Sequence, residues 1–409
     1  MPILLEEDMR FQLPRMHKVK QTFPRPRLGD IEGRIAEEMD KAEIRGKINS
    51  AARVAVAVGS RGIKNIALIV RTVVDQLKQA GVSPFIVTAM GSHGGGSPDG
   101  QREVLRSYGI TEEKMGVDIV TSVDVTHLGR TSRGIDVFFD DSALSADMIV
   151  PINRVKLHTD FVADIQSGLC KMLVIGLGNH IGCTAIHEVS FDFFGETILE
   201  ATAIILGRNK VGFGIGIVEN ACDETAMIEA IPSETLIERE KDLVRIAKEN
   251  MPTLMIPEID VLIVEEIGKN ISGAGYDPNI LGRSSILKEF VLEVPNIKRM
   301  VLFDVTEESH GNAIGMGMFD VITRKVFEKL DLEQIYANSI AVKCPDDAKI
   351  PIIADSEDEA VRIAIQMARD IDKEHLKIVR IKNTLELETI EVSDALTDYV
   401  STHAKLSLA

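Results

Sequence analysis

Short β-branched runs, polar or glycine-bearing loops and amphipathic segments alternate along the whole chain. Residues 53–58 (RVAVAV) predict a buried strand, which leads through a polar loop into a helix over 63–80. The layout recurs with a strand at 84–89 and a helix at 98–108, for which Ser97 is a suitable N-cap. We expect further strands at 118–121, 135–139 and 148–152 and a helix at 234–250. This order predicts a parallel or mixed sheet flanked by helices.

The second half of the chain continues the alternation. Buried runs at 259–268, 299–305, 335–342 and 378–383 predict strands, and 357–372 predicts a helix. The glycine-rich run 212–220 (GFGIGIVEN) fits a tightly packed strand, with a dinucleotide-binding loop as the alternative, and no Walker-type phosphate loop is present.

A chain of 409 residues exceeds what one hydrophobic core usually serves, so two domains are expected. We predict the α/β class: an N-terminal domain at 1–255, a Rossmann-like domain at 256–390 and an active-site cleft between them. Residues 391–409 are expected to form a helix that packs back on the first domain. Pro24 and Pro26 oppose helix, so residues 1–28 are expected to be an extended arm on the first domain.

The charge narrows the function classes. The chain has 63 acidic and 46 basic side chains and a formal charge of -17, which would repel nucleic acid and anionic lipid. No apolar run approaches the length of a membrane span, and the N-terminus lacks a signal-peptide layout, so a cytoplasmic location is expected. The four scattered cysteines fit reduced thiols.

Two strand-end loops carry candidate ligand-binding residues. Ser60 and Arg61 follow the first predicted strand, where a hydroxyl and a guanidinium near a helix start would hold a phosphate or carboxylate. His93 follows the second strand and precedes three glycines. If these strands are neighbours, the two loops share one crevice. The alternatives are a solvated arginine and a histidine in a flexible loop.

The stretch 153–188 combines a lysine with three histidines: His158, His180 and His187. Lys171 lies in the apolar run LCKMLVIGLG, where an ammonium would lose its hydration unless it is paired or used covalently. Metal-assisted hydrolysis by the three histidines with Asp160 or Glu188 stays open, although no H-E-x-x-H helix is present.

Four segments in one order now allow a comparison. S-R-G follows the first strand, G-S-H-G follows the second, K-x-H (156–158) lies at a later strand end, and S-G-x-x-K (167–171) is followed sixteen residues later by a histidine. This arrangement resembles the nickel-dependent lactate racemase family of 2-hydroxyacid racemases and epimerases. Val58, Gly62 and the segment SGLCKMLVIG depart from the family's usual pattern, which marks a divergent member.

The resemblance implies a cofactor and a division of roles. The family's nickel pincer cofactor, a pyridinium mononucleotide with thioamide and thiocarboxylate arms, would be tethered at Lys171 with its nickel bound by His187. The two acid–base histidines would be His93 and His158. Ser60 and Arg61 would hold the mononucleotide phosphate and the reactants. Proteins that make the cofactor are then expected partners.

The chemistry agrees with such an assignment. Inverting a 2-hydroxy acid through a ketone needs a hydride acceptor and a base for each enantiomer, and histidine titrates near neutral pH. In the second domain, the loop KNISGAGYDPNILGR offers Asp277 and Arg283 as substrate contacts, with a structural turn as an equal alternative. A ligand-binding homologue without turnover remains the alternative from another functional class, and a homo-oligomer stays open.

Overall fold

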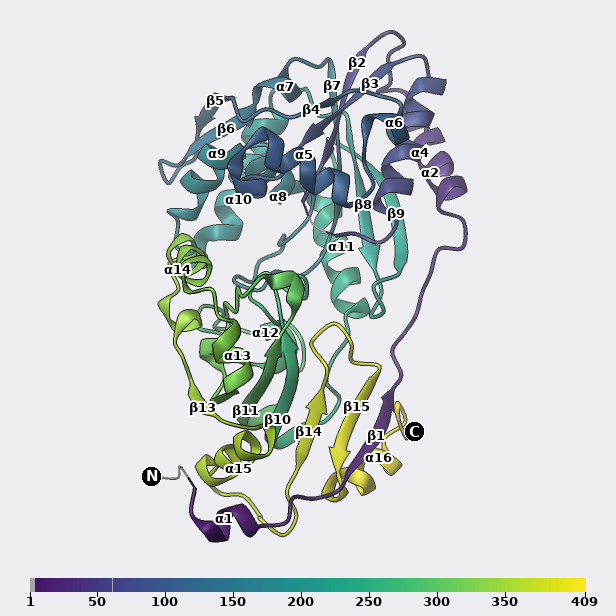
Figure 1. Cartoon of the computed structure of the whole chain (residues 1–409). Helices are drawn as coiled ribbons and strands as arrows, with labels where there is room; N and C mark the ends of the chain where they lie inside the picture. The colour runs from purple at the N-terminus through teal and green to yellow at the C-terminus, as the bar shows by residue number, and fades with distance from the viewer. Residues whose placement is uncertain (1–3, 61) are drawn as a thin grey trace. The chain divides into compact units, whose positions relative to one another are not determined.

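The computed structural model describes residues 4–60 and 62–409, and the chain divides into two compact units. The first unit is Arg25–Met251, and the second joins Met1–Pro24 to Pro252–Ala409. Both are α/β, as predicted, and both are built on a largely parallel sheet (Figure 1). The division between Met251 and Pro252 falls a few residues before the predicted boundary.

The first unit contains a six-stranded sheet in the order β4-β3-β2-β7-β8-β9, parallel except for the last pair. Its strands are β2 (Arg53–Val58), β3 (Ser83–Thr88), β4 (Ile119–Val120), β7 (Met148–Arg154), β8 (Phe213–Glu219) and β9 (Thr225–Pro232). The run 212–220 is therefore a strand and not a nucleotide loop. A separate hairpin pairs β5 (Val125–Arg130) with β6 (Asp136–Asp140), so the strand predicted at 135–139 lies outside the main sheet.

Helices of the first unit begin where the sequence provides caps. The Ser97 hydroxyl accepts the Gly100 N–H at 3.2 Å, and Asp30 accepts the Gly33 N–H at 2.8 Å. The helices are α2 (Ile31–Asp40), α3 (Ala42–Arg45), α4 (Ile66–Gln79), α5 (Pro98–Ser107), α6 (Glu112–Met115), α7 (Asp141–Leu144), α8 (Leu169–Lys171), α9 (Asn179–His187), α10 (Phe194–Leu206) and α11 (Leu236–Asn250). Buried faces of α2 and α4 join the sheet in one apolar core.

The second unit contains an eight-stranded mixed sheet in the order β13-β12-β11-β10-β14-β15-β1-β16. The first five strands are parallel: β13 (Ile352–Ala354), β12 (Val321–Thr323), β11 (Asn296–Val305), β10 (Glu258–Ile267) and β14 (Ile378–Ile381). The antiparallel edge consists of β15 (Thr389–Ser393), β1 (Met16–Gln21) and β16 (Leu406–Leu408). Its helices are α1 (Glu6–Arg10), α12 (Pro278–Leu281), α13 (Arg324–Lys329), α14 (Leu332–Ala341), α15 (Glu357–Met367) and α16 (Thr397–Thr402).

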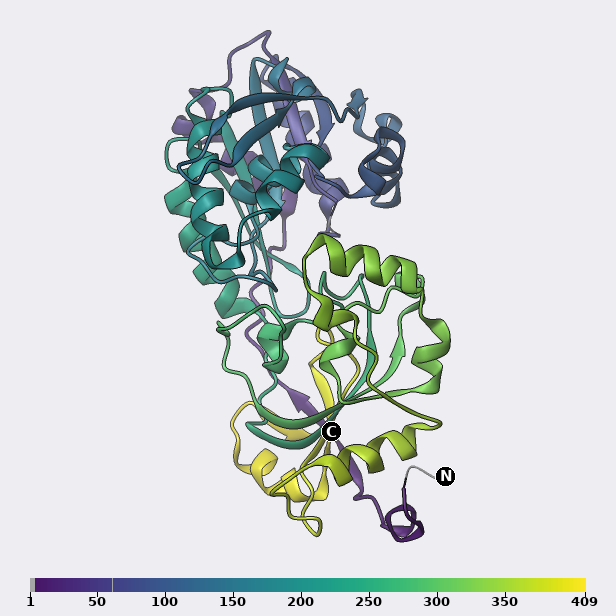
Figure 2. The ribbon, with the colours of Figure 1, turned by 90° about the vertical axis from the view of Figure 1, so that its left-hand side faces the viewer.

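The predicted location of the N-terminal arm is wrong. The arm is extended only after the short helix α1, and its strand β1 belongs to the second unit, where it pairs with β15 and β16 (Figures 1 and 2). The buried Gln21 amide donates to the Leu387 carbonyl at 2.7 Å. Pairing satisfies an otherwise open edge of β15, a non-local effect that no local pattern reveals.

Two other predictions are also wrong. The tail 391–409 is not one helix packed on the first unit, because β15 and β16 flank the short α16 and all three belong to the second unit. Residues 335–342, expected as a strand, form the end of α14, whose N-cap Asp331 accepts the Gln334 N–H at 3.1 Å. That cap was a readable helix signal.

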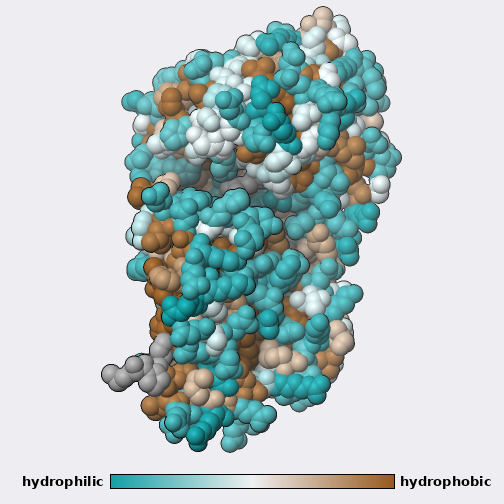
Figure 3. All heavy atoms as spheres, in the orientation of Figure 1, coloured by the Kyte–Doolittle hydropathy of each residue, from teal (hydrophilic) through white to brown (hydrophobic). Residues whose placement is uncertain are grey.

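The face shown in Figure 3 is dominated by hydrophilic residues, with apolar ones scattered among them. Such scatter is ordinary for a protein surface. Within the described ranges, no single helix has the length and apolar character to cross a membrane. One pair, Leu169–Gly176 with Asn179–His187, meets both criteria only when taken together and is bent by 108°.

Candidate functional site

Three neighbouring parallel strands of the first unit end at one edge, and their loops carry the predicted residues. β2 lies between β3 and β7, and its last residue, Val58, aligns with Thr88 on one side and Ile152 on the other. The segments that follow Val58, Thr88 and Arg154 therefore leave the sheet at the same edge. Carboxyl ends of parallel strands are where open α/β sheets bind ligands.

The first two loops meet through Ser60 and His93. The Ser60 hydroxyl and His93 Nδ1 form a short hydrogen bond, and the Tyr108 hydroxyl donates to the Ser60 carbonyl at 2.6 Å. The loops thus lie side by side, as neighbouring strands require. Arg61 falls outside the described residues, so its predicted role is tested by nothing in the structure.

The lysine segment, residues 168–176, is hydrogen-bonded to this edge at both ends. α8 continues into a π-helical turn, Met172–Gly176, and both are buried apart from the partly exposed Lys171. The Asn153 side-chain amide donates to the Gly168 carbonyl at 2.8 Å, and the Gly91 N–H donates to the Gly176 carbonyl at 3.0 Å. A Cβ at Gly176 would lie 2.7 Å from the Ala89 carbonyl oxygen, so glycine permits this close approach. π-helical turns are rare and concentrate at functional sites.

Lys171 and His158, thirteen residues apart, are brought into contact. Lys171 Nζ and His158 Nε2 form a short hydrogen bond. The His158 ring stacks on Phe161 with centroids 4.5 Å apart, and its backbone N–H donates to the buried Gln166 side chain at 2.7 Å. The histidine is therefore held on one side of the amine by packing and by the backbone.

The hydrogen bonds of His158 also constrain where its proton lies. Nδ1 accepts the Asp160 N–H at 3.1 Å. In the neutral tautomer that accepts there, Nε2 carries the hydrogen, and Nε2 is the nitrogen beside Lys171.

His187 ends α9 and has the geometry of a single metal ligand. Its Nδ1 donates to the Cys183 carbonyl at 2.6 Å, because a carbonyl oxygen only accepts. In the neutral ring this leaves Nε2 with its lone pair, the state in which imidazole binds a metal while its other nitrogen holds the ring in place. Phe194 packs on the ring at 5.2 Å between centroids.

Cys183 lies between His187 and the His93 loop. Its sulfur is 3.6 Å from His187 Nδ1 and 3.8 Å from the Ser92 hydroxyl. Burial disfavours both charged forms, but the hydrogen bond and charge between the two side chains outweigh it. The pKa of His187 is therefore raised and the pKa of Cys183 lowered from their ordinary values.

A metal held by protein side chains alone does not fit this arrangement. Within residues 4–60 and 62–409, no group of three or more His, Cys, Asp or Glu side chains is placed to hold one. His180 is exposed beside the glycine loop. A Cβ added at Gly96 would lie 3.6 Å from the Cβ of His180. The hydrolase alternative needs such a group. A metal brought by a cofactor would need fewer ligands from the protein, and the Nε2 lone pair of a neutral His187 would be suited to such a role.

Glu240 is a functional candidate that our reading of the sequence missed. It projects from α11, is 0% exposed, and accepts the Cys170 N–H at 2.9 Å beneath the lysine segment. Burial raises its pKa to about 7, although hydrogen bonds from Cys170 oppose the shift. A signal existed, because Glu240 interrupts the apolar face of α11 formed by Leu236, Leu243 and Ala247.

In the second unit, Asp277 and Arg283 have structural partners. Arg283 donates to Asp320 at 2.7 Å and to the backbone carbonyls of Met318, Ile297 and Lys298. Asp277 is buried and caps α12 by accepting the Asn279 N–H at 2.9 Å. These contacts favour the structural alternative over substrate binding for both residues.

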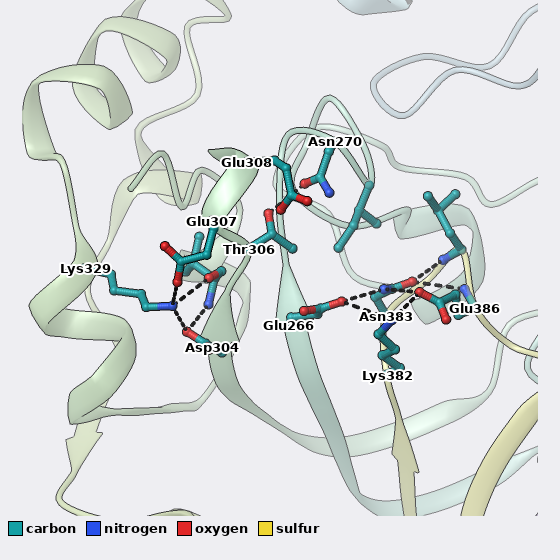
Figure 4. A pocket seen from close by; sticks show the side chains of 13 residues that line it. Glu266, Asn270, Asp304, Thr306, Glu307, Glu308, Lys329, Lys382, Asn383 and Glu386 are labelled. Carbon is teal, nitrogen blue, oxygen red and sulfur yellow. Dashed lines mark hydrogen bonds and ion pairs between the residues drawn. The ribbon is translucent and has the colours of Figure 1, made fainter. Parts of the chain in front are cut away.

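A pocket of about 360 Å³ lies at the carboxyl ends of β10, β11 and β14 in the second unit (Figure 4). Its lining charges pair with one another: Lys329 contacts Asp304 and Glu307, and Lys382 contacts Glu386. Lys325 and Lys329 hold the pKa of Asp304 below its ordinary value, against the effect of burial. The same region of a parallel sheet is thus used differently in the two units.

Comparisons with known proteins bear on the family and the fold of the chain. Residues 12–195 match the sequence model of the lactate racemase N-terminal domain. The structure of the lactate racemase apoprotein from Thermoanaerobacterium thermosaccharolyticum matches with a TM-score of 0.54 and 12% identity, over 90% of this chain and 94% of that chain. The comparison with curated proteins gave no match.

At 12% identity the structural likeness bears on the fold, and it confirms the α/β class for nearly the whole length of the chain. The sequence match includes Ser60, His93, His158, Lys171 and His187. Residues 12–195 are thus similar to the lactate racemase N-terminal domain, which supports a place for the chain in the lactate racemase family.

Proposed function

We propose that the chain is a racemase or epimerase of a 2-hydroxy acid that works with a nickel pincer nucleotide tethered at Lys171. The observation that carries the proposal is the contact between Lys171 Nζ and His158 Nε2 inside a lactate racemase domain. It joins a tethering amine to a proton-transfer group at the ligand-binding edge of a parallel sheet.

Two residues of the chain would hold the cofactor. Lys171 offers an amine for an amide bond, and His187 offers Nε2 as a single nickel ligand. The bound group would supply the acceptor that takes a hydride from the carbon of the substrate and returns it.

The proton chemistry belongs to His93 and His158. Each enantiomer needs a base that removes the hydroxyl proton as hydride leaves and returns it afterwards. Ser60 engages His93 Nδ1, which orients the ring with Nε2 as the nitrogen for proton exchange. His158 exchanges its proton through Nε2, the atom beside Lys171. The resemblance gives Arg61 the substrate carboxylate or the cofactor phosphate.

Intact-protein mass spectrometry tests the tether. The chain is co-expressed with the enzymes that make the pincer nucleotide, and its mass and nickel content are measured. The proposal requires an adduct on Lys171 with one nickel per chain, and Lys171→Ala must lose both. An unmodified, nickel-free chain under these conditions would overturn the proposal in favour of a ligand-binding homologue. Hydrolytic activity of a nickel-free chain would indicate the hydrolase class instead.

Activity assays test the acid–base pair. The loaded protein is offered single enantiomers of small 2-hydroxy acids, and inversion is followed by chiral chromatography. His93→Ala and His158→Ala should each stop inversion and keep the adduct. Unchanged turnover in both variants would show that other groups move the proton.

A further inference from the structure

Glu240 is a fully buried carboxyl below the backbone that carries Lys171. It comes from α11, about seventy residues further along the chain, and its Oε2 accepts the Cys170 N–H at 2.9 Å. Burial and the neighbouring Glu240 carboxyl both raise the pKa of the Cys170 thiol. Burying an ionisable carboxyl is costly, so one retained on an apolar helix face needs a specific partner.

The partner is the first turn of the lysine segment. Opening N–H groups of a helical turn have no acceptor within the turn, and the carboxyl supplies one for Cys170. The fit is close, because a Cβ at Gly168 would collide with the Glu240 carboxyl. The φ of -178° at Gly168 is ordinary extended backbone, so glycine is needed here for space and not for conformation.

The opposite side of the segment is fixed by other contacts. Asn153 holds the Gly168 carbonyl from the end of β7, and Gly91 holds the Gly176 carbonyl from the β3 loop. The Cys170 amide, next to Lys171, is held from α11 by the Glu240 side chain. The direction in which Lys171 leaves the backbone is therefore tied to this carboxyl.

We propose that Glu240 is a positioning residue, whose carboxyl anchors the Cys170 amide and thereby directs the Lys171 amine at His158. This role depends on the hydrogen bond and not only on packing. A cavity made elsewhere on α11 should therefore leave the anchor intact. Its importance for cofactor attachment rests on the proposed function, whereas the anchoring of Lys171 does not.

Three variants separate anchoring from general stability. Glu240→Gln keeps an acceptor oxygen, and Glu240→Ala removes it. Leu243→Ala makes a cavity on the same buried face of α11 without touching the anchor, because Leu243 packs towards Gly216 of β8. Glu238→Ala is the surface control, since Glu238 is 76% exposed on that helix.

Two measurements on the cofactor-free chain read the position of Lys171. Acetylation by an N-hydroxysuccinimide ester, followed by peptide mass spectrometry, gives the reactivity of its amine, and hydrogen exchange gives the protection of the 168–172 backbone. Glu240→Ala should change the Lys171 acetylation rate by about tenfold and lower the protection, as expected for a group released from a fixed geometry. Glu240→Gln should restore most of both, and Leu243→Ala should lower the melting temperature without changing either.

Equal acetylation rates and protection in wild type, Glu240→Ala and Glu240→Gln would overturn the proposal. If Glu240→Ala does not fold, Glu240→Leu, which fills the space without an acceptor oxygen, takes its place. Altered acetylation and lowered protection in Glu240→Leu support the anchor, and wild-type values in it refute the anchor. Adduct formation in co-expressed chains is a third readout. Its absence from the wild type would refute the proposed function, and the two cofactor-free measurements would still decide on Glu240.

Discussion

The carboxyl ends of the two parallel sheets differ in how their charges are compensated. At the edge of the first unit, His158 contacts Lys171, and the fully buried Glu240 carboxyl accepts a hydrogen bond from the Cys170 amide. At the edge of the second unit, the carboxylates of Asp304, Glu307 and Glu386 are paired with lysines.

Both edges have the topology that favours ligand binding, so topology does not distinguish them. The side chains do. Most of the charged side chains around the second pocket are paired with one another. At the first edge, the side-chain nitrogens of His158 and Lys171 contact each other. Imidazole and amine groups exchange protons and form covalent bonds. The predictions below test this distinction.

The largest effect should come from the two lysine positions. Lys171→Ala should abolish the adduct and all inversion, because no other amine occupies that position beside His158 in the described chain. Lys382→Ala, which removes an exposed lysine paired with Glu386, should keep the adduct. Mass spectrometry and nickel analysis of the two variants make the comparison. An adduct that survives in Lys171→Ala would remove the chemical difference between the edges.

The acid–base pair should show the next largest effect. His93→Ala and His158→Ala should each reduce the rate of inversion by roughly 10²- to 10⁴-fold, the usual contribution of a general acid–base group. The control is His375→Ala, because His375 is exposed and contacts Asp372 at 2.9 Å on the second unit. Rates with saturating substrate should be compared at constant adduct occupancy. A loss confined to KM would contradict proton transfer.

The contributions of Glu240 and of the lysine-paired Asp304 to the free energy of unfolding should depend on pH in opposite directions. The pKa of Glu240 is raised from 4.5 to about 7 by burial, so its contribution is fully present below pH 4.5 and is lost as pH rises through 7. Glu240→Gln should remove a decline of roughly 3 kcal/mol from urea-unfolding curves over that window. The pKa of Asp304 is lowered, so its contribution is present above the unfolded value and is lost as pH falls. Asp304→Asn should flatten only the acid side of the plot of unfolding free energy against pH. Equal slopes in both variants would contradict the assignment.

The smallest effect concerns Arg283. Arg283→Ala should destabilise the second unit by about 2 kcal/mol, because it removes one donor each from Asp320 and from three carbonyls in a partly exposed site. Urea unfolding measures this, and adduct formation at Lys171 serves as the control that should not change. A stable variant with greatly weakened substrate binding would restore Arg283 as a substrate contact.

Local patterns predicted much of the first unit. The strand RVAVAV was placed at 53–58 and is β2 (Arg53–Val58), and the Ser97 cap begins α5 as expected. These predictions work because burial alternation and capping depend on neighbours in sequence. The N-terminal arm and the tail were misplaced because β1, β15 and β16 pair across hundreds of residues, and their strand pattern says nothing about the partner.

The candidate site divides in the same way. The sequence by itself determined the residue types and their order: a histidine and a serine after two strands, then His158, Lys171 and His187. Only the tertiary structure decided that Ser60 meets His93, that His158 meets Lys171, and that Arg283 is occupied by Asp320. It alone brought Glu240 beneath Cys170. The physical reason is that hydrogen bonds between distant segments depend on how helices and strands pack, and packing joins residues that the order of the chain keeps apart.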